Sequence, residues 1–153
     1  GTYTSMARNK RGNRKSEYAM MELELLSVLA ENAGKAYPTE ELNRMWETIL
    51  TNQFHDILPG SSIREVYEQT KKEYAEIAET SAELISERLN ALCAKKDESV
   101  TVWNTLGHRR NDIVELGANS AEALTDGTID IAVHIAKDMR KTCRPRDIRC
   151  CVR

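Results

Sequence analysis

His55 and Asp56 are neighbours at the point where an amphipathic pattern gives way to the pair Pro59-Gly60. The pattern predicts a helix and Pro-Gly is a turn signal, so both side chains are expected at a helix end, beside the start of the next helix. A neutral imidazole binds a cation such as zinc, and the adjacent carboxylate can orient a ligand or accept hydrogen bonds from hydroxyl groups. By itself the pair is more typical of a helix cap or a surface pair, because a zinc site needs three or four ligands.

Two helices are expected before this pair. Over about residues 15–32, apolar residues recur at spacings of three and four, and Gly34 follows where a left-handed cap is usual. The residues that carry this spacing are Tyr18, Met21, Leu25, Val28 and Leu29. The second helix is expected to start at Thr39, which can cap it, and to end at about Phe54.

A long third helix and a β segment are expected after the pair. Ser62 and Glu65 have the spacing of a capping box, and an apolar stripe then continues for more than seven turns. A helix of that length needs partners along it, and the first two helices can supply them. Residues 100–103 and 112–116 read as strands. The predicted fold class is therefore mainly α, a three-helix bundle followed by a short β segment that opens a truncated β domain.

The turn sequence also resembles a known family. Residues 52–63, NQFHDILPGSSI, with Val66 and Tyr67 after them, are similar to the signature of glycoside hydrolase family 38, the α-mannosidases. The resemblance is to the bacterial and the cytosolic or vacuolar type, because Golgi and lysosomal members carry His-His-Asp-Ala at this place. Residues 1–14 resemble the stretch that leaves the catalytic barrel of this family. Residues 102–116 resemble the start of its C-terminal β domain.

The resemblance implies a retaining α-mannosidase that acts on mannose-containing oligosaccharides or glycosides. It makes His55 a zinc ligand, alongside one histidine and two carboxylates of the barrel, with cobalt as an alternative metal. Asp56 would bind the mannose beside the metal, and Tyr3 would line the substrate pocket. The nucleophile and the acid/base would both lie upstream of Gly1, so no catalytic residue is assigned in this chain. We expect these residues alone to be a fragment without activity.

The resemblance also divides the chain. Residues 1–14 would end the barrel domain or link it to the next, and residues 15–97 would form the three-helix middle domain. Residues 98–131 would begin the C-terminal β domain, and residues 132–153 form a tail with no predicted structure. The partners implied are the barrel and β domains of the same protein, while the oligomeric state stays open.

Composition narrows the functional classes. The 153 residues carry a net charge of −2, which gives no general attraction to nucleic acid or to an anionic membrane. No run of eighteen apolar residues predicts a membrane span, and no signal peptide is visible. Four cysteines without CxxC spacing read as free thiols of a reducing compartment, so a cytoplasmic location is expected.

Two other functions fit parts of the sequence. The long helices could form a non-enzymatic interaction module in which His55-Asp56 only caps a helix, although such a module has no need of the His-Asp-x-x-Pro-Gly-Ser context. The basic residues between positions 8 and 15 could contact nucleic acid, but the net charge of the chain disfavours this.

Overall fold

The structure is a computed structural model that describes residues 4–93, 99–105 and 130–135. The chain divides into two compact units, Gly1–Leu92 and Cys93–Arg153, and each is described by itself. Within the described residues, no helix is long and apolar enough to cross a membrane. The domain boundaries drawn from the sequence stay predictions.

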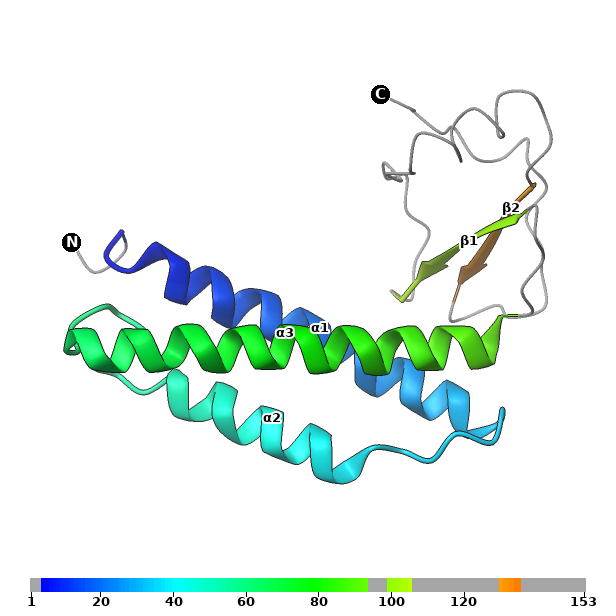
Figure 1. Ribbon diagram of the computed structural model, residues 1–153. Coiled ribbons are helices and arrows are strands. Elements are labelled where there is room, and N and C mark those ends of the chain that lie inside the picture. The colour runs from blue at the N-terminus through cyan, green and yellow to red at the C-terminus, as the bar shows by residue number, and fades with distance from the viewer. Residues whose placement is uncertain (1–3, 94–98, 106–129, 136–153) are drawn as a thin grey trace. The chain divides into compact units, whose positions relative to one another are not determined.

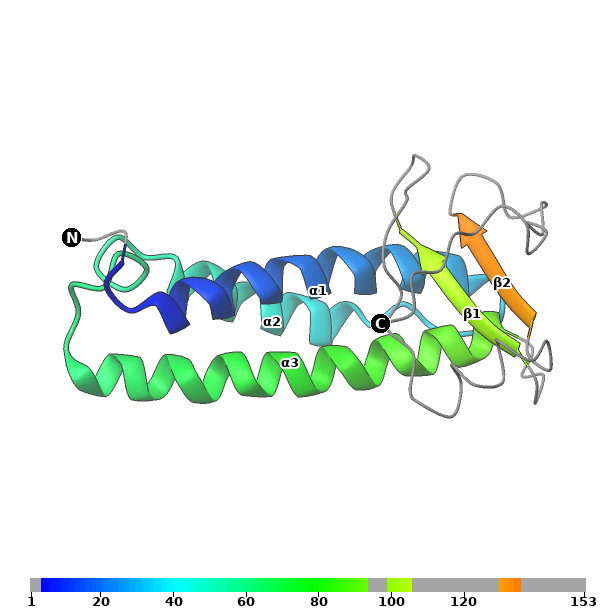
Figure 2. The same ribbon diagram turned by 90° about the horizontal axis from the view of Figure 1, so that it is seen from above.

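The first unit is a bundle of three helices, α1 (Ala7–Glu31), α2 (Thr39–Asn52) and α3 (Arg64–Leu92). Helices α1 and α3 run in the same direction, and α2 runs back alongside them (Figures 1 and 2). The connection between α2 and α3 therefore lies beside the start of α1, as both views show. The predicted mainly α fold with a three-helix bundle is confirmed.

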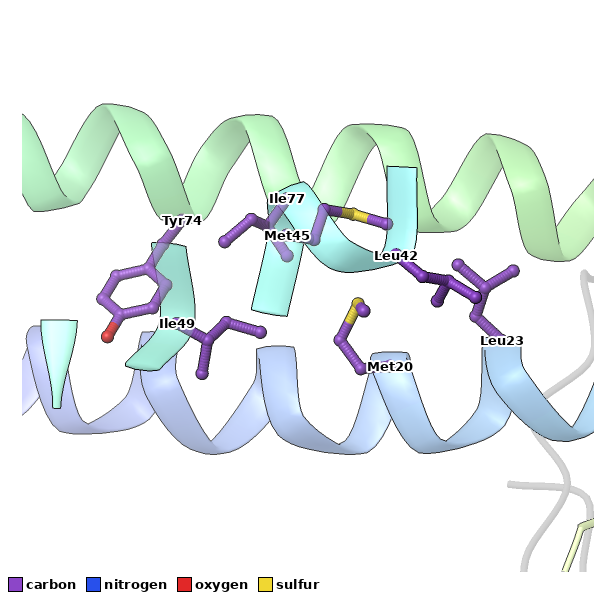
Figure 3. Close-up of a cluster of buried hydrophobic side chains, with 7 residues drawn as sticks. All are labelled: Met20, Leu23, Leu42, Met45, Ile49, Tyr74 and Ile77. Atoms are coloured by element: carbon purple, nitrogen blue, oxygen red, sulfur yellow. The ribbon is translucent and has the colours of Figure 1, made fainter. Parts of the chain in front are cut away.

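The core of the bundle draws apolar side chains from all three helices, which point toward one another in Figure 3. Its buried members are Met20 and Leu23 of α1, Leu42, Met45 and Ile49 of α2, and Tyr74 and Ile77 of α3. Trp46 packs against this cluster, and its indole Nε1 donates to Oε1 of Glu24 at 2.7 Å. Burial of each such side chain stabilises the fold by about 1.5–3 kcal/mol. This burial supplies most of the stability of the bundle, because isolated helices are only marginally stable in water.

Helix α1 starts at Ala7, so the predicted start near residue 15 is wrong. Gly12 and the surrounding basic residues favoured a loop, but Gly12 lies within the helix and has a packing reason. A Cβ atom at this position would lie 2.8 Å from Cδ2 of the Tyr74 ring. The glycine therefore lets α1 and α3 approach closely, and that gain offsets its low helix propensity.

The buried face of α1 also differs from the predicted stripe. Tyr18, Met21 and Val28 are more than half exposed, whereas Met20 and Leu23 are fully buried. Both sets recur at helical spacing, so the period alone could not decide which one faces α2 and α3. The predicted helix is confirmed, but its predicted face is wrong by about one residue.

The ends of α2 and the end of α1 follow simple backbone chemistry. Gly34 adopts a φ of +80°, the left-handed conformation expected just past α1. Helix α2 starts at Thr39 as predicted, but no side-chain hydrogen bond caps it, so the predicted capping by Thr39 is wrong. Glu40 and Glu41 lie in its first turn, where negative charge favours the helix dipole.

A buried arginine near the end of α3 joins this helix to α1 and to the connection between α1 and α2. Arg88 of α3 is only 4% exposed, and its Nε donates to Oγ of Ser27 at 2.9 Å. Its other nitrogens donate to the carbonyls of Leu84 and Ala36 and to the carboxylate of Glu87. A buried charge is tolerated when it is paired and hydrogen-bonded in this way.

The second unit contains two paired strands. Strand β1 (Ser99–Asn104) pairs in parallel with β2 (Asp130–Ile135), with Ser99 opposite Asp130. The strand predicted at residues 100–103 is confirmed, while the one predicted at 112–116 lies outside the described residues. Strand β2 falls partly in the tail for which no structure was predicted. Cys93 is a free thiol, and its sulfur accepts a hydrogen bond from Nε1 of Trp103 at 3.2 Å.

Candidate functional site

The candidate site is the turn that joins α2 to α3, which we define as residues 53–62. Helix α2 ends because Gln53 turns its backbone to a ψ of 0°, and Phe54 N–H then bonds back to the Thr51 carbonyl at 3.1 Å. The next turn closes through Ile57 N–H to the Phe54 carbonyl at 2.9 Å. This tight winding places two consecutive side chains, those of residues 55 and 56, at the tip of a helix.

The side chains of His55 and Asp56 both project into solvent. They are 77% and 59% exposed, and Nε2 of His55 lies 3.4 Å from Oδ2 of Asp56. The imidazole also contacts the Phe54 ring, and the two ring centroids lie 4.1 Å apart. The pair is thus open to an outside ligand and is held mainly through its backbone.

Three side chains from other helices hold that backbone. Nδ2 of Asn9 donates to the Ile57 carbonyl at 3.3 Å, and the Tyr67 hydroxyl donates to the same carbonyl at 3.2 Å. Nζ of Lys10 donates to the Pro59 carbonyl at 3.1 Å and also to the carbonyl of Ser5. Carbonyls at the end of a helix lack partners within it, so these donors satisfy groups that would otherwise need water.

A polar layer lies directly beneath the turn. Nε2 of Gln53 donates to Oδ1 of Asn13 at 3.1 Å and to Oε1 of Glu17 at 2.9 Å, which joins the turn to α1. Nδ2 of Asn52, a residue only 2% exposed, donates to Oε2 of Glu73 at 2.8 Å, which joins it to α3. Because buried amides are costly when unpaired, this layer fixes the position of the turn on the bundle.

Gly60 is required by the shape of the turn. Its φ of +101° is a conformation that side-chain-bearing residues rarely adopt. A Cβ atom here would lie 2.8 Å from Cβ of Ser5 and 3.2 Å from the Ser5 backbone. The segment before α1 therefore packs directly on the Pro-Gly turn.

Tyr74, a tyrosine of the apolar core, has a strongly shifted pKa. Burial, with a smaller contribution from the nearby carboxylates of Glu73 and Glu17, raises the pKa of Tyr74 to about 12. Its hydroxyl is buried and has no hydrogen-bond partner among the described atoms. Tyr74 and Asn9 both line a cavity of about 190 Å³ between α1 and α3.

The structure brings together some of the residues that the sequence singled out. His55 and Asp56 share one anchored turn, while Tyr3 lies outside the described residues. Sequence reasoning missed Asn9, Lys10 and Asn13 as supports of the turn. Their spacing on a helix was a usable signal, but it was hidden by the expectation of a basic loop.

A metal would find one donor of its preferred kind here. Histidine nitrogen is a common zinc ligand, and the His55 ring is exposed. Among the residues that the structure describes, no group of three or more His, Cys, Asp or Glu side chains could hold a metal ion. A metal site at this turn would need donors beyond the described residues.

Comparison with known protein families shows to which family this chain belongs. Residues 1–92 match the family model described as the alpha mannosidase middle domain. The chain belongs to the α-mannosidase middle-domain family. The match covers the entire three-helix unit, including the turn with His55 and Asp56, and it confirms the resemblance to glycoside hydrolase family 38.

Individual α-mannosidases agree with this assignment of the middle domain. Human Alpha-mannosidase 2C1 is 38% identical over 133 residues, which cover 82% of this chain and 13% of the human protein. Alpha-mannosidase G of Dictyostelium discoideum is 37% identical over 90 residues, or 59% of this chain and 8% of its own length. Alpha-mannosidase of Saccharomyces cerevisiae is 46% identical over 71 residues, which cover 44% of this chain and 6% of the yeast protein. The chain thus spans a small part of the relatives that it matches.

Proposed function

We propose that this chain serves a metal-dependent retaining α-mannosidase, to which it contributes one zinc ligand, His55, and one substrate-binding carboxylate, Asp56. The observation that carries the proposal is an exposed His-Asp pair on a rigidly anchored turn, in a chain of the α-mannosidase middle-domain family. The substrate class would be mannose-containing oligosaccharides or glycosides. The remaining metal ligands would come from the barrel domain of the same protein.

The chemistry of the pair fits a shared zinc site. Nε2 of His55 lies 3.4 Å from Oδ2 of Asp56, and a neutral imidazole offers a nitrogen lone pair to a cation. The exposed ring needs no rearrangement of the bundle to meet a metal held by another domain. Zinc is the metal proposed, and cobalt is the alternative, since nitrogen and carboxylate donors suit both.

The two residues would have distinct roles. His55 holds the metal in place, and the Asp56 carboxylate accepts hydrogen bonds from hydroxyl groups of the mannose beside it. When bound, the metal supplies a positive centre that can hold sugar hydroxyls and favour the distorted ring of an oxocarbenium-like transition state. Rigid support matters because a ligand misplaced by about 1 Å loses much of its effect.

The proposal leaves the bond-breaking groups to the rest of the enzyme. Retaining glycosidases use two carboxyl groups about 5–5.5 Å apart as nucleophile and acid/base. No residue of this chain is assigned to either role, so we expect the 153 residues alone to be inactive. A cytoplasmic protein of the cytosolic or vacuolar type is the setting that we propose, on the basis of the His-Asp-x-x-Pro-Gly motif.

An interaction surface is the second candidate, and one observation favours it. Tyr18, Met21 and Val28 form an exposed apolar row on α1, and such rows often mark contacts with other protein surfaces. We propose that this row meets other domains of the same mannosidase, so the two functions are compatible. A chain that served only as a docking module would not depend on His55.

The test is hydrolysis of an aryl α-mannoside by the full-length protein. We expect His55→Ala to lower the zinc content of the purified protein, because loss of a ligand weakens the metal site. We expect the same variant to lower kcat/KM by at least about 100-fold. Asp56→Asn should raise KM or lower kcat while zinc stays bound. The control is His108→Ala, which removes a histidine outside the motif and should leave both quantities unchanged. Full activity of His55→Ala would contradict the proposal.

A further inference from the structure

The hydroxyl of Tyr67 contacts both sides of the Pro-Gly turn. Tyr67 lies in the first turn of α3, and its oxygen accepts a hydrogen bond from the Ser62 N–H at 2.9 Å. The same oxygen lies 3.2 Å from the Ile57 carbonyl and 3.5 Å from the Asp56 carbonyl. A hydroxyl has one hydrogen and two lone pairs, so it can accept from Ser62 while it donates to one of the two carbonyls.

We propose that Tyr67 is a positioning residue that sets the direction of the His55 and Asp56 side chains toward the metal and the sugar. The inference rests on the proposed function of these two residues. It adds a named residue, outside the His-Asp pair, on which zinc affinity depends.

The exposure of the pair supports this role. The His55 and Asp56 side chains are mostly in solvent, and the contacts described for them are with each other and with Phe54. Their orientation is therefore inherited from the backbone of the turn. Asn9 and Lys10 also donate to that backbone, at Ile57 and Pro59. The Ser61 hydroxyl donates to the Asp56 carbonyl at 3.4 Å, but it lies within the turn itself. The Tyr67 hydroxyl comes from α3 and lies near the carbonyls of both Asp56 and Ile57 while it accepts from the Ser62 N–H.

Loss of this hydroxyl would let the turn sample more conformations. Binding to a site that is correctly oriented for only part of the time is weakened by that fraction. One hydrogen bond shifts such an equilibrium by about fivefold, and outer supports of metal ligands typically change affinity by about tenfold or more. We therefore expect zinc affinity to fall by about 5- to 10-fold in Tyr67→Phe.

The chain offers a matched control in Tyr74→Phe. Tyr74 lies two turns further along α3, and its buried hydroxyl has no partner among the described atoms. The two variants remove the same atom from the same helix. One removal breaks hydrogen bonds to the turn, and the other breaks none that the structure describes.

The experiment measures zinc affinity in the full-length protein by competition with a chelator, and amide hydrogen exchange of Ser62 in the zinc-free protein. Tyr67→Phe should weaken zinc about 5- to 10-fold and speed Ser62 exchange about fivefold or more, while Tyr74→Phe matches the wild type in both. Zinc affinity is compared well below the melting temperature, so a loss of stability alone would not move it. The phenylalanine keeps the ring and its packing.

Two outcomes separate this inference from the proposed function. If His55→Ala abolishes zinc binding but Tyr67→Phe binds zinc within twofold of the wild type, the hydroxyl is merely structural and the positioning role is refuted. If His55→Ala leaves zinc affinity unchanged, the proposed function itself fails, and the positioning role fails with it. An equal loss of affinity in Tyr67→Phe and Tyr74→Phe would also overturn the inference.

Discussion

Replacement of Gly60 by alanine should disrupt the turn through two separable effects. The first is the backbone: at a φ of +101°, a residue with a side chain pays about 1–2 kcal/mol. The second is the contact with Ser5, since the new Cβ would lie 2.8 Å from the Ser5 Cβ. Forced overlap of this kind typically costs about 1–3 kcal/mol. Alanine also restricts the unfolded chain, which returns about 0.4–1 kcal/mol.

We therefore predict that Gly60→Ala lowers the free energy of unfolding by about 1–4.6 kcal/mol, with a midpoint of about 3 kcal/mol. Gly34→Ala is the control, because Gly34 also has a positive φ, +80°, but a Cβ there meets nothing within 4 Å. This control should lose only about 1 kcal/mol, from the backbone effect less the gain in the unfolded state. Urea unfolding followed by circular dichroism measures both values.

A double-mutant cycle isolates the contact. Ser5→Gly removes the Cβ that the new methyl group would meet, so it should restore about 1 kcal/mol or more to Gly60→Ala. In amide NMR spectra, the signals of residues 54–58 and 60 should move in Gly60→Ala and stay in place in Gly34→Ala. Equal destabilisation by the two glycine variants, with no coupling to Ser5, would refute the close packing of the turn on the segment before α1.

Three further predictions concern the bundle that carries the turn. Met20→Ala should lower the free energy of unfolding by about 2–5 kcal/mol, because the Met20 side chain is 0% exposed. Met21→Ala should lower it by less than about 0.5 kcal/mol, because Met21 is 58% exposed. A larger loss for Met21→Ala than for Met20→Ala in urea unfolding would contradict the assigned buried face of α1. Arg88→Lys should lower the free energy of unfolding by about 2 kcal/mol, because a lysine ammonium cannot make the several hydrogen bonds of the buried guanidinium. Arg64→Lys, at an exposed ion pair, should change it by less than about 0.5 kcal/mol. Equal effects of the two substitutions would argue against the buried hydrogen bonds of Arg88. Stability should fall as pH rises above 10, because the unfolded chain loses the Tyr74 proton near pH 10 while the folded chain holds it to about 12. Tyr37 also has a raised pKa, so Tyr74→Phe should reduce this fall in a pH titration without abolishing it, and an unchanged fall would contradict the assignment.

The sequence predicted much of the fold because helical periodicity and turn signals are local. The three helices, the start of α2 at Thr39 and the left-handed Gly34 all follow from patterns within a few residues. The face of α1 did not follow, since Met21 fits the period as well as Met20 does. The choice between them depends on which residues of α2 and α3 lie opposite, which is a property of the packed bundle.

The candidate site divides in the same way. The sequence motif indicated His55 and Asp56, because a His-Asp pair before Pro-Gly is a local feature. The supports of the turn were missed, since Asn9 and Lys10 lie 48 and 49 residues from their partners Ile57 and Pro59. Gly12 also misled the prediction: its reason is the ring of Tyr74 on another helix, which no local pattern contains.

The most direct test of the account is the position of zinc itself. Crystals of the full-length protein grown with zinc, measured on both sides of the zinc absorption edge, would locate the ion by its anomalous scattering. We predict a peak about 2.0–2.1 Å from a ring nitrogen of His55, with the Asp56 carboxylate facing the adjacent sugar site. A zinc peak elsewhere, with the His55 ring still in solvent, would contradict it.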